Sequence, residues 1–71
     1  MPGAGDAASV ARSHALQRLV EAAEDIAASQ DRARLAAGDA LPPDDAAYLR
    51  AMAETCRTIA NRLRNSPGYM P

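Results

Sequence analysis

The chain contains no phenylalanine, tryptophan or lysine, and it has one cysteine and one histidine. Aromatic residues make up only 3% of it, although hydrophobic residues reach 48%, because about half of the apolar content is alanine. Alanine removes little area from water when it is buried, and a chain this short buries only about 60% of its unfolded surface. We therefore expect the core to be too small to stabilise the chain alone, so that a partner surface is needed.

The scarcity of cysteine and histidine bears on catalysis and metal binding. A single cysteine excludes an intramolecular disulfide and a cysteine-based metal site. His14 has no His, Cys or acidic residue three or four positions away, and the acidic residues Glu21, Glu24 and Asp25 lack the Glu-x-x-His spacing of di-iron bundles. No nucleophile stands beside a candidate base. We predict no catalytic residue, no metal ligand and no cofactor, and hence a protein that is not an enzyme.

The charges of the chain are nearly balanced, with a net charge of −1 and arginine as the only basic residue besides His14. This balance creates no strong field toward nucleic acid or a membrane surface. No stretch approaches the roughly 18 consecutive apolar residues of a transmembrane helix. The first residues also lack the basic and apolar regions of a signal peptide. We therefore expect a cytoplasmic protein that does not enter the membrane.

The distribution of proline and glycine predicts a long first helix. Residues 1–8 are expected to form a flexible tail, in which Asp6 is one candidate for the N-cap of the following helix and Ser9 is the other. Residues 9–37 contain no proline, no glycine and few β-branched residues. Nothing in this segment interrupts a helix, so we predict one continuous helix over 9–37.

A turn and a second helix are predicted to follow. Gly38 suits the left-handed position just after a helix, and the two prolines that end the Gly-Asp-Ala-Leu-Pro-Pro segment prevent the first helix from continuing. Pro43 fits the first position of a new helix, with two aspartates next to it at the positive end of the helix dipole. We therefore predict a turn over 38–42, a helix over 43–65 and a short C-terminal tail over 66–71.

Apolar residues recur with helical spacing in both segments. In the second helix they alternate three and four apart, the pattern of a heptad seam, with Ala53 and Ala60 at its margins. In the first helix they share one face, although Gln30 and Arg34 interrupt it. The candidate interface residues are Leu16, Leu19, Ala23, Ile26, Leu49, Met52, Cys56, Ile59 and Leu63.

A short connection makes the two helices antiparallel neighbours. If the turn is centred near residue 40 or 41, Ala23 lies opposite Ile59, and the acidic residues around Glu24 fall level with Arg57 and Arg62. The apolar and charged patterns thus predict the same register. The expected fold is an all-α, two-helix antiparallel hairpin that forms half of a four-helix bundle with a second copy or a partner.

This architecture predicts a non-enzymatic protein–protein interaction module that acts through an apolar helical face. Such a module serves as a small adaptor, inhibitor or assembly subunit, for example as a homodimer or as a phage or mobile-element accessory protein. The alternative is a small nucleic-acid-binding regulator. Arg50, Arg57 and Arg64 recur at seven-residue spacing along one side of the second helix, where a stripe of this kind contacts phosphates or an acidic partner.

Two further features of the sequence leave alternatives open. Cys56 lies in the predicted seam, either as a small buried apolar side chain or as a redox switch or cross-link to a second copy. The first helix is expected to be longer than the second, which leaves residues 10–14 overhanging. Tyr69 and Met70 in the tail either form a short docking peptide, remain inert, or fold back over this overhang.

Overall fold

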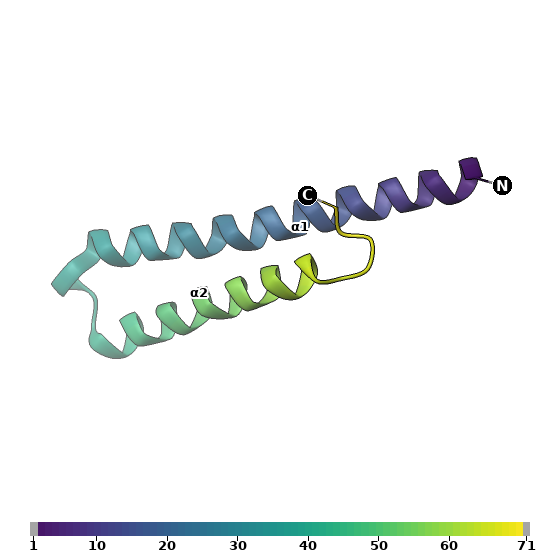
Figure 1. The fold of residues 1–71 in the computed structure, drawn as a ribbon. Coiled ribbons are helices and arrows are strands. Elements are labelled where there is room, and N and C mark those ends of the chain that lie inside the picture. The colour runs from purple at the N-terminus through teal and green to yellow at the C-terminus, as the bar shows by residue number, and fades with distance from the viewer. Residues whose placement is uncertain (1, 71) are drawn as a thin grey trace.

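The computed structural model describes the backbone of residues 2–70 and the side chains of residues 7–70. The chain forms two α-helices, α1 (Pro2–Ala37) and α2 (Pro43–Arg64), joined by the short 3-10 helix η1 (Gly38–Ala40). The two helices pack side by side in opposite directions, and no strand occurs in the described backbone (Figure 1). The prediction of an all-helical antiparallel hairpin is confirmed.

Helix α1 begins at Pro2, whereas the sequence predicted a flexible tail over 1–8. Proline is compatible with the first helical position because its missing N–H would have no intrahelical partner there, and the alanines that follow favour helix propagation. Ser9 therefore lies inside the helix and does not cap it. The side chain of Asp6, the other candidate cap, lies outside the described residues, as does Met1.

The turn agrees with the sequence prediction. Gly38 follows α1 with a φ of +52°, the left-handed conformation that glycine adopts without a steric penalty. The backbone N–H of Leu41 donates to the carbonyl oxygen of Gly38 over 3.3 Å. Helix α2 then begins at Pro43 and carries Asp44 and Asp45 in its first turn. Their negative charges interact favourably there with the positive end of the helix dipole.

Helix α2 ends at Arg64, and the chain then reverses direction. The backbone N–H of Asn65 still bonds to the helix, and Ser66 donates its backbone N–H to the carbonyl oxygen of Leu63 over 3.1 Å. Gly68 adopts a φ of +94°, which directs the last described residues back toward α1, as Figure 1 shows. Pro71, the last residue of the predicted tail, lies outside the described residues.

The hairpin is a rod with a single pair of helices across its width. Its extents are 59 × 16 × 13 Å, and its radius of gyration is 16.7 Å. A compact domain of the same length would have a radius of gyration of about 11 Å. Because no further layer covers either helix, the described side chains that do not face the other helix or the tail are open to solvent.

Candidate protein-interaction surface

The two helices contact each other mainly through small side chains. The buried apolar residues among the described side chains are Val20 and Ala27 of α1 and Ala53 and Ala60 of α2, each at most 2% exposed. Within each helix the two residues are seven positions apart, the repeat that keeps one side of a helix against its neighbour. We call this line of contact the seam. Since alanine is so short, the seam buries little apolar area for each turn of helix.

Half-buried residues complete the seam between these buried positions. They include five of the predicted interface residues, namely Leu16, Ala23, Leu49, Cys56 and Leu63. These five therefore pack within the hairpin, against the opposite helix. Cys56 is a free, half-buried cysteine in the seam, and both of its interpretations stay predictions.

The other four predicted interface residues lie outside the seam and are between 38% and 54% exposed: Leu19, Ile26, Met52 and Ile59. The sequence interpretation placed the last two in the seam and the alanines Ala53 and Ala60 at its margins. That assignment is wrong, because α2 is turned so that these alanines face α1. The seven-residue spacing of Val20 and Ala27 indicates the observed seam. Alanines occur at so many other positions, however, that this spacing does not distinguish the seam from other faces of the helix.

The four exposed residues lie along one side of the hairpin, which we call the apolar side. Leu19 and Ile26 each directly precede a buried residue of α1, and Met52 and Ile59 do the same on α2. They therefore occupy the heptad position that flanks the seam. In an antiparallel pair, the equivalent flanking positions of the two helices meet on the same side. The apolar side is thus a strip to which both helices contribute.

No charged residue interrupts this strip along α2. Between Asp45 and Arg62, the residues on this side of the helix are Tyr48, Met52, Thr55 and Ile59. Tyr48, which is 66% exposed, extends the strip toward the turn. Uncharged, half-exposed large side chains arranged in a line along two helices are typical of a surface that another helix covers.

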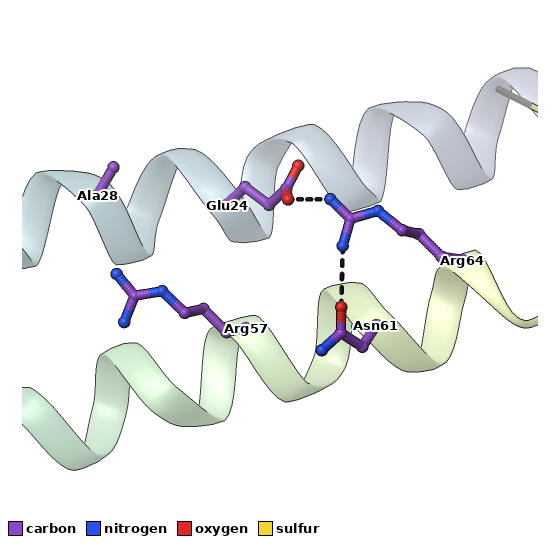
Figure 2. A pocket seen from close by; sticks show the side chains of 5 residues that line it. All are labelled: Glu24, Ala28, Arg57, Asn61 and Arg64. Atoms are coloured by element: carbon purple, nitrogen blue, oxygen red, sulfur yellow. Dashed lines mark hydrogen bonds and ion pairs between the residues drawn. The ribbon is translucent and has the colours of Figure 1, made fainter.

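The opposite side of the hairpin is polar, and two ion pairs on it join the helices. Figure 2 shows that Arg64 of α2 donates to the carboxylate of Glu24 of α1 and also to Oδ1 of Asn61, over 2.9 Å. Nearer the turn, Arg57 of α2 donates to the carboxylate of Asp31. Both ion pairs connect the two helices, so they contribute to the register of the hairpin.

The observed ion pairs differ from those that the register prediction gave. Glu24 was expected level with Arg57, but it pairs with Arg64, one heptad further along α2. Arg57 reaches Asp31 instead, an acid that the sequence interpretation left out. The long arginine side chain extends along the helix surface before it meets its partner. The position of its Cα atom along the helix axis therefore does not by itself identify that partner.

Asp31 is the centre of a small charged cluster near the turn. Its carboxylate accepts hydrogen bonds from Arg57 and from Arg34, the latter over 3.0 Å. These bonds, Arg57 first, hold the pKa of Asp31 below its ordinary value of 3.8. Two polar atoms in the adjoining part of the seam are buried without a hydrogen-bond partner, namely Nε of Arg34 and Oε1 of Gln30. These are the two residues that interrupt the apolar face of α1 in the sequence.

The predicted arginine stripe is largely occupied by contacts within the hairpin. Arg57 and Arg64 are paired with acids of α1, and only Arg50 of the three takes part in no ion pair among the described side chains. A phosphate would have to compete with Asp31 and Glu24 for the two paired guanidinium groups. This arrangement weakens the case for the stripe as a phosphate-binding surface.

The C-terminal tail folds back over the part of α1 that extends beyond α2. The side-chain amide of Gln17 donates to the carbonyl oxygen of Met70, and a Cβ atom on Gly68 would lie 2.9 Å from Cδ of Arg12. The side chain of Met70 lines a shallow groove together with Val10 and its neighbours on α1. Of the alternatives for the tail, the structure shows it packed on the overhang.

No group of three or more His, Cys, Asp or Glu side chains among residues 7–70 is arranged to hold a metal ion, and His14 is exposed on α1. Neither helix, as far as it is described, is long and apolar enough to cross a membrane. Comparison with known proteins finds no match to this chain among protein-family models, curated proteins or solved structures.

Proposed function

We propose that this chain is a non-enzymatic protein-interaction module whose apolar side completes a four-helix bundle. The observation that carries the proposal is the distribution of side-chain size. Val20 and three alanines are the buried apolar residues between the two helices, with Leu16, Leu49 and Leu63 half-buried beside them, whereas four large side chains are left half-exposed on one side: Leu19, Ile26, Met52 and Ile59. Because the free energy of burial increases with apolar area, a hairpin that functions alone is expected to place its largest side chains in its own seam.

The shape of the apolar side fits a second pair of helices. It runs along both α1 and α2, so that a covering pair of helices would contact it over several turns and bury large side chains in the middle of four helices. The polar side, with its ion pairs between the helices, would then face solvent. A second copy of the chain or two helices of a larger protein would meet this requirement. The corresponding roles are those of an adaptor, an inhibitor or an assembly subunit.

The proposal is tested by measuring association and helicity on the same samples. We expect sedimentation equilibrium to show an oligomer whose Tm, followed by circular dichroism, rises with protein concentration, since binding only to the folded state stabilises it. A poorly helical monomer that becomes helical when a partner is added would also support the proposal. A chain that stays monomeric at millimolar concentration and melts cooperatively, at a concentration-independent Tm, would contradict it.

A further inference from the structure

We infer that the partner of the apolar side is a second copy of this chain, placed antiparallel so that the turn of each copy lies beside the open end of the other. This inference rests on the proposed function, because it names the occupant of the same surface. Three properties of the hairpin support it: the area that it exposes, the distribution of charge along its length, and the positions of the charges that bound the apolar side.

The exposed area matches what a dimer of this chain needs. The hairpin exposes 5260 Å² for a mass of 7.4 kDa, whereas a compact monomer of this mass exposes about 4,200 Å². The excess is therefore on the order of 1,000 Å². A stable interface buries about 800 Å² on each partner. One additional hairpin, covering one side, would thus bring the exposed area of each copy to that of an ordinary folded monomer.

Charge is distributed unequally along the rod. The turn end carries three exposed aspartates, namely Asp39, Asp44 and Asp45, with Arg32 as the closest exposed arginine on α1. The open end carries three exposed arginines, namely Arg12, Arg18 and Arg62, and among the described side chains of α1 the acid closest to Arg18 is Glu21. None of these six residues forms an ion pair among the described side chains. Each end of the hairpin therefore attracts the opposite end of a second copy.

The charges that bound the apolar side fit a two-fold axis across the middle of α2. Asp45 and Arg62 lie at opposite ends of the uncharged stretch, and its midpoint falls between Met52 and Thr55. A two-fold rotation about that midpoint brings Asp45 of one copy to Arg62 of the other, twice in each dimer. The other face-to-face arrangement, with both turns at the same end, would bring the aspartates of the two turns together, which is destabilising.

Charge reversal at the turn distinguishes these arrangements. We expect Asp45→Arg to raise the dimer Kd on the order of tenfold, because two attractive contacts become repulsive. Asp44→Arg is the comparison variant: it makes the same charge change in the first turn of α2 but points away from the apolar side, so we expect it to raise the Kd less than Asp45→Arg does. Combining Asp45→Arg with Arg62→Glu should restore the Kd toward that of the wild type. Sodium chloride should weaken the wild-type dimer, because attraction between opposite charges is screened.

A cross-linking experiment tests the same geometry without changing the charges at the ends. In a Cys56→Ala background, Thr55→Cys places a thiol close to the proposed two-fold axis, and we expect a short bis-maleimide reagent to join two copies efficiently. Glu54→Cys in the same background is the matched control, because the neighbouring position faces the polar side. Equal cross-linking of the two variants would overturn the proposed arrangement.

Each remaining outcome of these experiments also has a definite meaning. A dimer that is strengthened by salt and by Asp45→Arg would overturn the antiparallel arrangement and leave the proposed function intact. A wild-type chain that is a poorly helical monomer would overturn the second copy as occupant, and the apolar side would then be assigned to a different protein. A monomer that is stably folded by itself would overturn the proposed function as well.

Discussion

A substitution of Ile59 by aspartate provides the sharpest test of the apolar side. Ile59 is 46% exposed in the hairpin and lies within the strip, between Met52 and Arg62. In the hairpin alone, an aspartate at this position keeps much of its hydration, so the direct effect on packing within the chain is small. In a bundle the same carboxylate is placed against a partner helix, and the closest positive charge on this side of α2 is Arg62, on the next turn at the edge of the strip.

The expected magnitude follows from the exposure of this side chain. Covering the half of Ile59 that remains exposed contributes about 1 kcal/mol for each copy. A carboxylate that loses its hydration in the same place, with only Arg62 on the next turn, costs a further ~1–3 kcal/mol. A symmetric dimer contains this site twice, so Ile59→Asp is expected to destabilise it by about 4–8 kcal/mol, which raises the Kd about a thousand-fold or more. Under the proposed function folding depends on association, so we expect helicity to fall together with it.

The matched control is Thr58→Asp, which introduces the same charge one residue away on the outward face of α2. Sedimentation equilibrium and circular dichroism of both variants, at equal protein concentrations, give the comparison. We expect Thr58→Asp to associate as the wild type does and Ile59→Asp to be a monomer with reduced helicity. If the Ile59→Asp variant retained the oligomeric state and the helicity of the Thr58→Asp control, the apolar side would not be an interface.

Four further predictions concern the hairpin itself and are measured by thermal or chemical denaturation. Gly38→Ala should cost about 1–2 kcal/mol, because the φ of +52° strains any L-residue even though an added Cβ would meet no atom within 4 Å. Gln30→Leu should stabilise the fold by about 1 kcal/mol, since it removes a buried oxygen that has no hydrogen-bond partner. Ala60→Leu should destabilise it by about 1–3 kcal/mol through overpacking, whereas a helix rotated to expose this residue would tolerate the change. The pKa of Asp31 is lowered by Arg57, so its contribution is present above pH 3.8 and is lost as the pH falls through the folded-state value. Acid should therefore lower the Tm of the wild type more than that of an Asp31→Asn variant.

The sequence predicted the course of the backbone well because local chemistry determines it. Gly38, which needs a left-handed conformation, and Pro43, which fits only the first turn of a helix, mark the limits of the turn without reference to the rest of the chain. The start of α1 was predicted less well. The sequence predicts a flexible tail over residues 1–8, whereas α1 begins at Pro2, where a proline is compatible with the first helical position.

The rotation of each helix about its own axis was beyond the reach of the sequence pattern. Met52 and Ala53 are adjacent, and each belongs to a series with heptad spacing, so two seams were available on α2. A ranking by hydrophobicity selects the series that contains Met52 and Ile59. The structure selects the series that contains Ala53 and Ala60, and this choice depends on contacts with α1 that a single helix does not reveal.

The ion pairs of the polar side favour the observed rotation of the helices, in which four large side chains lie outside the seam. Rotating each helix by about one residue, roughly 100°, would bring Ile26 and Ile59 into the seam. The same rotation would carry Glu24 and Asp31 away from the arginines of α2 with which they pair. Exposed ion pairs of this kind contribute only about 0–1 kcal/mol each, so they would not by themselves outweigh the burial of the large side chains. Under the proposed function, a partner that covers those side chains would remove the advantage of rotation, and the small preference supplied by the ion pairs would then suffice to determine which side faces out.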